Sequence, residues 1–154
     1  MAQEQFVYVT FIRTTPEALW AALTQPEFTR AYWSGTWHDT TWEEGSSWKL
    51  MFPDGRVADA GEVKEVRKPE RLVLRWRNEF MPELKAEGFS TCTFELEPSG
   101  EMVKLTVTHQ IDWPQSKFIH AVSGGWPKVL SSLKSLLETG KALSHPPKEE
   151  LKKA

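Results

Sequence analysis

Hydrophobic residues recur with helical spacing near the end of the chain, in residues 123–140 (SGGWPKVLSSLKSLLETG). The apolar positions are Trp126, Val129, Leu130, Leu133, Leu136 and Leu137, which all lie on one face of a helix. Gly140 suits the left-handed conformation that ends many helices. Pro127 fits best in a first helical turn, so we expect a bend at Gly124-Gly125 before it. The pattern predicts a long amphipathic helix that covers a broad apolar surface.

The middle of the chain alternates apolar and polar residues with a period of two, which is typical of strands with one buried face. Turn sequences such as Pro53-Asp54-Gly55 and Pro98-Ser99-Gly100 separate these segments. The predicted strands are residues 5–13, 36–42, 46–52, 56–68, 71–78, 90–97 and 101–110. The alternation breaks between Val63 and Val66, which are three residues apart. This irregularity predicts a β-bulge that helps to bend the sheet.

Two short helices are predicted directly after the first strand. Their start signals are Thr14-Thr15-Pro16-Glu17 and Thr24-Gln25-Pro26-Glu27, in which threonine caps the helix and proline suits its first turn. The second helix is expected to run through Trp33 and to end at Gly35. Residues 81–88 are expected to form a polar connection. Most of the predicted strands follow one another along the chain, separate from the helices, which indicates the α+β class.

We therefore expect a single domain over residues 1–140. It consists of a strongly curved antiparallel sheet of about six to seven strands, with two short helices after the first strand. The long C-terminal helix packs across the concave face of the sheet. Residues 141–154 are polar, contain two prolines and are expected to form a loose tail.

Composition excludes several classes of protein. The 154 residues include 19 basic and 21 acidic side chains, so the basic excess needed to hold nucleic acid or an anionic membrane is missing. No apolar run approaches the roughly 20 residues of a membrane helix, and the N-terminus lacks a secretion signal. The single cysteine, Cys92, rules out an internal disulfide and fits a reducing compartment. We expect a cytoplasmic protein with neither nucleic acid nor membrane as a partner.

The unusual feature of the composition is its eight tryptophans and eight phenylalanines. Core packing can explain each inward ring individually, but so many rings beneath a curved sheet favour a cavity between sheet and helix. Trp33 and Trp37 flank the junction of the short helices and the sheet, where an entrance is expected. The candidate ligand-binding residues are Trp33, Trp37, Trp48, Phe52, Trp76, Phe94, His109, Trp126, Leu130 and Leu133.

His109 is the main candidate for chemistry, because it ends a strand whose other inward residues are all apolar. Its ring either bonds a nearby backbone carbonyl or faces the cavity as a ligand-binding group or general acid/base. Asp59, Glu62 and Glu65 share one strand, and the bulge could turn one of them inward. Four histidines and one cysteine show no metal-ligand spacing, and nucleotide-binding and nucleophile motifs are missing. We expect no metal and no cofactor.

Short motifs along residues 5–140 form an ordered set. They are Thr15-Pro16-Glu17 with Leu19-Trp20, Gly61-Glu62-Val63, Pro69-Glu70-Arg71-Leu72, Thr93-Phe94, Leu105-Thr106, and Gly125-Trp126 with Leu130, Leu133 and Leu137. Together with the order of elements, this set resembles the helix-grip fold of the SRPBCC, or START-like, superfamily, which includes the birch-pollen allergen type. Within it, the chain is most similar to the group related to the activator of the heat-shock 90 chaperone ATPase.

The resemblance implies a hydrophobic cavity between the sheet and the C-terminal helix that holds lipids, polyketides or other apolar molecules. We therefore expect a binding protein for a small hydrophobic or aromatic ligand. One alternative is an enzyme of the polyketide cyclase/dehydratase kind, or a hydrolase, that uses His109 or an inward carboxylate. Another is an interaction module that regulates a chaperone, although the chaperone activators carry an additional N-terminal domain. A homodimer through exposed strand edges or helices is a further alternative.

Overall fold

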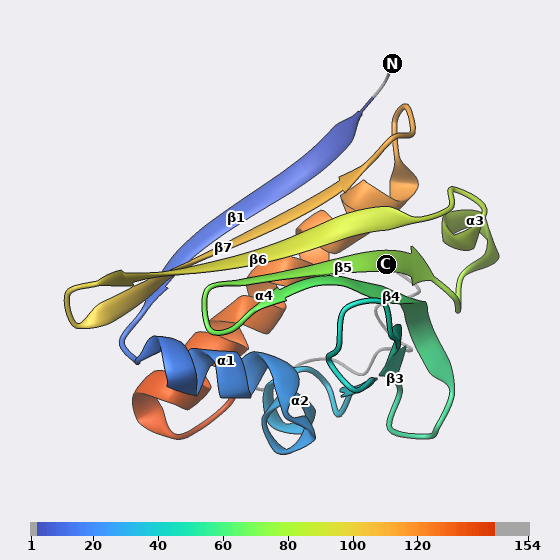
Figure 1. The fold of residues 1–154 in the computed structure, drawn as a ribbon. Helices are drawn as coiled ribbons and strands as arrows, with labels where there is room; N and C mark the ends of the chain where they lie inside the picture. Colours follow the sequence, from blue (N-terminus) through green and yellow to red (C-terminus); the bar gives the residue numbers. More distant parts are fainter. Residues whose placement is uncertain (1–2, 144–154) are drawn as a thin grey trace.

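The computed structural model describes residues 3–143, in which seven strands form one antiparallel sheet in the order β1-β7-β6-β5-β4-β3-β2 (Figure 1). The strands are β1 (Glu4–Ile12), β2 (Trp37–Asp39), β3 (Ser47–Met51), β4 (Val57–Arg67), β5 (Arg71–Asn78), β6 (Ser90–Ser99) and β7 (Met102–Ile111). The helices are α1 (Pro16–Thr24), α2 (Pro26–Tyr32), α3 (Pro82–Lys85) and α4 (Lys117–Thr139). The tail expected in residues 141–154 falls outside the described residues from 144 onward.

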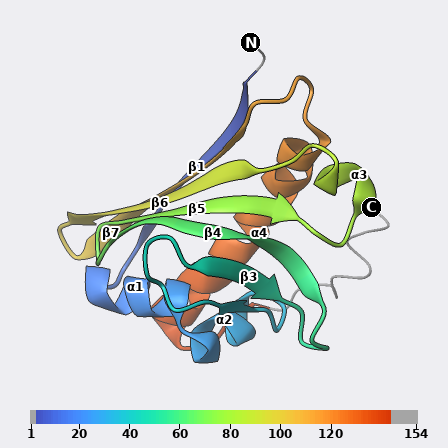
Figure 2. The same ribbon diagram turned by 45° about the vertical axis from the view of Figure 1, so that its right-hand side comes forward.

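The sheet is strongly curved, and α4 runs across its concave face (Figures 1 and 2). Helices α1 and α2 lie beside the C-terminal part of α4 in both views. Every second residue along β7 is buried, from Val103 to Ile111, as expected for a strand with one face on the core. The α+β, helix-grip architecture predicted from the sequence is confirmed.

The predicted β-bulge is present in β4. The pairing of β4 with β5 shifts register between Val63 and Glu65, at the point where the alternation of the sequence breaks. An extra residue on one strand bends that strand and increases its twist. The bulge therefore contributes to the curvature that wraps the sheet around α4.

The predicted start of the long helix is wrong. Helix α4 begins at Lys117 rather than at residue 123, and Pro127 lies inside it. The Ser116 side chain caps the helix by accepting the Ile119 N–H at 3.0 Å. Proline at 127 removes the helical bond to the Ser123 carbonyl, but packing of the apolar face supplies most of a helix's stability in a folded protein. The expected bend at Gly124-Gly125 therefore does not interrupt the helix.

Two smaller expectations also need correction. Residues 81–88 are not only a connection, because α3 forms one turn there and buries Leu84. Strand β2 spans only Trp37–Asp39 instead of 36–42, because Trp42 adopts a left-handed φ of 62° that no strand accommodates. Of these two segments, α3 borders the site described below.

Candidate functional site

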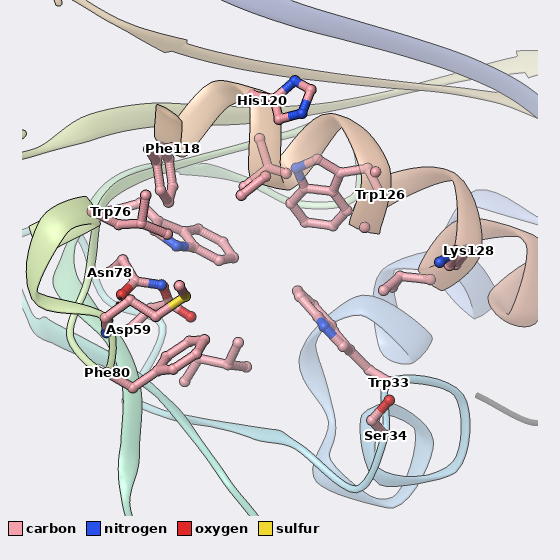
Figure 3. A pocket seen from close by; sticks show the side chains of 18 residues that line it. Trp33, Ser34, Asp59, Trp76, Asn78, Phe80, Phe118, His120, Trp126 and Lys128 are labelled. Atoms are coloured by element: carbon pink, nitrogen blue, oxygen red, sulfur yellow. Dashed lines mark hydrogen bonds between the residues drawn. The ribbon is translucent and has the colours of Figure 1, made fainter. Parts of the chain in front are cut away.

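A pocket of about 420 Å³ lies between α4 and the wall formed by β4, β5 and α3 (Figure 3). Its volume falls in the usual range for small-molecule sites, roughly 300–1,000 Å³. Its aromatic and aliphatic walls are Trp33, Leu50, Trp76, Phe80, Met81, Leu84, Phe118, Val122, Trp126 and Val129. The remaining lining residues are Ser34, Asp59, Asn78, His120, Ala121, Gly124, Gly125 and Lys128.

Three tryptophans from three different elements form the inner wall. Trp33 ends α2, Trp76 lies in β5 and Trp126 lies in α4. Their ring centroids are 5.3 Å apart for Trp33–Trp126, 5.8 Å for Trp76–Trp126 and 6.3 Å for Trp33–Trp76. These distances are typical of interacting aromatic rings. The pocket therefore offers flat apolar surfaces held by mutual contact.

His109 lies behind this wall, fully buried and outside the pocket lining. Its Nδ1 accepts the indole N–H of Trp126 at 3.1 Å, which places the ring proton on Nε2. Nε2–H then donates to Ser90 Oγ at 2.9 Å, and the Ser90 hydroxyl donates to the Trp76 carbonyl at 2.8 Å. Burial lowers the pKa of His109 to about 3, so the ring is neutral near pH 7. This chain of bonds connects two of the three tryptophans.

A second buried histidine supports the third tryptophan. His38 Nδ1 accepts the indole N–H of Trp48 at 2.9 Å, and its ring meets Trp33 edge-on with centroids 5.5 Å apart. Burial lowers the pKa of His38 to about 3, although its hydrogen bond to the Leu23 backbone opposes the shift. Both histidines are therefore neutral hydrogen-bond acceptors for indole groups.

The candidate ligand-binding residues divide into pocket walls and core. Trp33, Trp76 and Trp126 line the pocket. Trp48, Phe52, Phe94, Leu130 and Leu133 are buried in the core behind or beside it. Trp37 is half-buried outside the pocket, with the Arg30 guanidinium 5.3 Å from its ring centroid. Of the two residues expected at an entrance, only Trp33 lines the pocket.

Several lining residues were missed because their elements were not predicted. Met81 and Leu84 belong to or adjoin α3, and Phe118 and Val122 lie in the first turns of α4. The spacing of Phe118, Val122 and Trp126 at i, i+4 and i+8, after the capping Ser116, was a usable signal for a longer helix.

One side of the pocket is polar. Asp59 in β4 and Asn78 in β5 are register partners, and each is 5% exposed. Asn78 Oδ1 accepts the Met81 N–H at 2.8 Å, which fixes the orientation of the amide. The Trp76 ring lies next to both residues (Figure 3), and its buried Nε1 has no acceptor within the part of the chain that the structure describes.

Two negative findings apply to residues 3–143. No group of three or more His, Cys, Asp or Glu residues in this range is arranged to hold a metal ion. None of the helices formed by these residues is long and apolar enough to cross a membrane.

The curved sheet, the long helix and the pocket between them define a helix-grip protein of the SRPBCC superfamily. The model of the family "Activator of Hsp90 ATPase homolog 1-like protein" matches residues 13–138. The chain belongs to this family, which confirms the resemblance seen in the motifs. The comparison with curated proteins found no match.

Solved structures share the fold over nearly the whole chain. Protein MLL2253 from Mesorhizobium loti is 26% identical, with 88% of this chain and 97% of that one covered and a TM-score of 0.75. The Aha1 dimer from Colwellia psychrerythraea is 20% identical, with 90% and 99% covered and a TM-score of 0.70. DynU16, from the dynemicin biosynthetic locus, is 22% identical, with 90% and 48% covered and a TM-score of 0.70. The last two likenesses concern the fold alone.

Proposed function

We propose that the protein binds a small hydrophobic or aromatic molecule in the pocket between the sheet and α4. The observation that carries the proposal is a pocket of about 420 Å³ whose wall includes Trp33, Trp76 and Trp126. A largely apolar cleft with a few polar groups is the usual form of a small-molecule site. Binding would bury apolar ligand surface against the three rings.

Two glycines of α4 support the proposal because they keep the pocket open. A Cβ added at Gly124 or Gly125 would meet no atom within 4 Å, so close packing does not require glycine at either position. Glycine inside a helix costs roughly 0.5–1 kcal/mol relative to alanine. The two glycines would compensate for this loss of helix stability by leaving room for a ligand beside Trp126.

Thermal unfolding with a panel of flat aromatic molecules and medium-chain fatty acids tests the proposal. A ligand at about 100 times its Kd stabilises the folded state by about 2.7 kcal/mol, which raises the Tm by roughly 5–10 °C. Gly125→Leu places a side chain in the pocket and should abolish the shift for every ligand. Ser131→Leu adds the same side chain at an exposed position of α4 and is the matched control.

Two outcomes would refute the proposal. The first is a wild-type Tm that no member of the panel changes at saturating concentration. The second is an unchanged ligand-induced shift in the Gly125→Leu variant, which would place binding elsewhere on the molecule.

Binding is favoured over a cyclase, dehydratase or hydrolase activity by the placement of His109. A general acid or base must reach the reacting group directly or through one water molecule. Both ring nitrogens of His109 are bonded to protein side chains, and the ring stands behind Trp76 and Trp126. Asp59 is the carboxylate that does line the pocket, so an enzymatic role would depend on it rather than on His109.

The other expected partners remain proposals. A chaperone-regulating role would require that an Hsp90 chaperone co-purifies with the protein, and the pocket needs no such partner. A homodimer would use the edge strand β1, whose Val7, Val9 and Phe11 are exposed. The cytoplasmic location also stays a prediction.

A further inference from the structure

We propose that the pocket takes ligands in which an apolar body carries one carboxylate, and that Lys128 and Ser34 hold this carboxylate at the rim. The inference rests on the proposed function and names the class of ligand that the same pocket prefers. An ammonium group and a hydroxyl group carry it, because both line the pocket and neither has a partner among residues 3–143.

Lys128 supplies the positive charge. It is the only lysine or arginine among the described residues that line the pocket, and its ammonium group forms no ion pair or hydrogen bond within residues 3–143. The side chain is exposed. A lysine stem can lie along an apolar wall while the ammonium group stays in water at the rim. An acidic group that reaches the rim would therefore meet a cation with no other partner.

Ser34 supplies a hydroxyl donor. It follows α2 with a left-handed φ of 53°, which is uncommon for a residue other than glycine. Glycine adopts this conformation more readily, so the turn itself does not require a serine. The side chain is half-buried, lines the pocket and makes no hydrogen bond within the described part of the chain. Backbone strain of this kind is typical of functional sites.

The two donors come from segments that also supply aromatic walls. Ser34 directly follows Trp33, and Lys128 is two residues after Trp126. The ring centroids of the two tryptophans are 5.3 Å apart. Figure 3 shows Lys128, Trp33 and Ser34 on one side of the pocket. A ligand whose apolar body lies against the two indoles therefore has its end within reach of the long, flexible Lys128 side chain.

The opposite side of the pocket holds the other polar groups. Asp59 and Asn78 line it, away from Lys128 and Ser34 (Figure 3). A carboxylate bound at Lys128 is therefore not placed beside the Asp59 carboxylate. Carboxylate oxygens accept hydrogen bonds from hydroxyl groups and pair with ammonium groups, so an acid uses both donors at the rim. The arrangement orients the ligand with its acidic end at the rim and its apolar end inside.

Calorimetric titration with 2-naphthoate, methyl 2-naphthoate and 2-naphthylmethylamine tests the inference, because the three molecules share one flat skeleton and differ in charge. We expect naphthoate to bind about three- to fivefold more tightly than the ester, as one ion pair near water allows, and the amine to bind most weakly. Sodium chloride at about 0.5 M should screen most of this difference and leave the Kd of the ester nearly unchanged. Decanoate and methyl decanoate give the same comparison for an aliphatic body.

Variants of the two donors separate their contributions. Lys128→Met keeps an unbranched apolar stem without the charge, so it should weaken the acid alone and bring the Kd values of acid and ester together. Lys49→Met changes an exposed lysine outside the pocket lining and is the matched control. Ser34→Gly removes the hydroxyl and accepts the left-handed φ, so it should weaken the acid about twofold without lowering the Tm of the free protein.

Equal Kd values for acid and ester would overturn the inference, as would an acid preference that Lys128→Met leaves intact, and in both cases the proposed function would stand. An unchanged Kd in Ser34→Gly would overturn the role of the hydroxyl group. If neither naphthalene ligand binds, the decanoate pair decides in the same way. If neither pair binds, the inference fails, and if the whole ligand panel is also inactive, the proposed function fails with it.

Discussion

At the scale of single residues, the two buried histidines are the groups whose chemistry the fold changes most. His38 and His109 each accept an indole N–H through Nδ1, and they are only 5% and 0% exposed, so water could hydrate a charged ring poorly. Their pKa values fall to about 3 because burial penalises the imidazolium form. The two histidines act as neutral hydrogen-bond acceptors that orient tryptophan side chains, and keeping them neutral makes the stability of the fold depend on pH.

We expect the free energy of unfolding to fall in acid. Between pH 6.5 and about pH 3 the unfolded chain binds protons at His38 and His109 that the folded protein excludes. The contribution of the two neutral histidines to the free energy of unfolding is therefore fully present above pH 6.5. It is lost as the pH decreases, by about 1.4 kcal/mol per pH unit for each histidine. Urea unfolding from pH 7 to about pH 4 measures the slope.

His109→Gln isolates one contribution, because glutamine can replace both hydrogen bonds without titrating. The slope should decrease by about half in this variant, and His120→Gln, at an exposed position, is the matched control. A His109→Gln variant with the wild-type slope would show that His109 takes up protons without unfolding.

At the scale of elements, α4 and β4 use glycine in opposite ways. In α4, Gly124 and Gly125 border open space, whereas Gly61 in β4 faces Arg75 of β5 so closely that a Cβ would lie 1.7 Å from its carbonyl oxygen. The helix keeps glycine to leave a pocket open, and the strand keeps it to let two backbones approach.

Replacing the two helical glycines should stabilise the protein and weaken its binding. Gly124→Ala and Gly125→Ala are each expected to raise the free energy of unfolding by roughly 0.5–1 kcal/mol, because alanine is the better helix former and meets no neighbouring atom. Denaturant unfolding gives the stability, and titration with a pocket ligand gives the affinity. Ser131→Ala, on the exposed side of α4, should change stability alone. Undiminished affinity in the glycine variants would contradict the assigned role.

In β4, replacing glycine by alanine is expected to lower the stability of the protein. Gly61→Ala forces a methyl group against the Arg75 carbonyl and should lower the free energy of unfolding by about 1–3 kcal/mol, as overpacking does elsewhere. Denaturant unfolding checks this value, with Gly124→Ala as the same substitution in open space. If Gly61→Ala left the free energy of unfolding unchanged, the backbones of β4 and β5 would move apart at this point more easily than their close approach indicates.

At the scale of the whole molecule, the alternating pattern was sufficient to predict the sheet but not which inward residues line the pocket. The range of β5 was predicted without error, because its apolar residues alternate cleanly and its turns are marked. The start of α4 was not, because Gly124-Gly125 and Pro127 disfavour a helix locally and tertiary packing overrides that preference. An inward position in a strand also does not tell whether a residue lines the pocket or lies in the core. Trp48 and Trp76 both point inward with centroids 4.5 Å apart, yet only Trp76 lines the pocket.

Residues that line the pocket and residues in the core should also differ in how much their truncation to alanine lowers the free energy of unfolding. Leu133 lies in the core and Leu50 lines the pocket, and both are almost fully buried. Leu133→Ala should cost about 2–5 kcal/mol, whereas Leu50→Ala should cost clearly less, because the space left by Leu50 adjoins an existing pocket instead of forming a new closed cavity. Denaturant unfolding of the two variants compares them directly. Equal losses would indicate that the pocket is closed in solution.

The tryptophan cluster has an optical consequence. Trp33, Trp48, Trp76 and Trp126 form an unbroken series with successive centroids 4.5–6.3 Å apart. Indole rings at such distances exchange excitation energy and couple their electronic transitions, so emission and near-ultraviolet circular dichroism belong to the cluster rather than to any one ring. A molecule that touches one wall of the pocket therefore perturbs the light absorbed and emitted by all four. The protein carries its own optical reporter of occupancy, with no label attached.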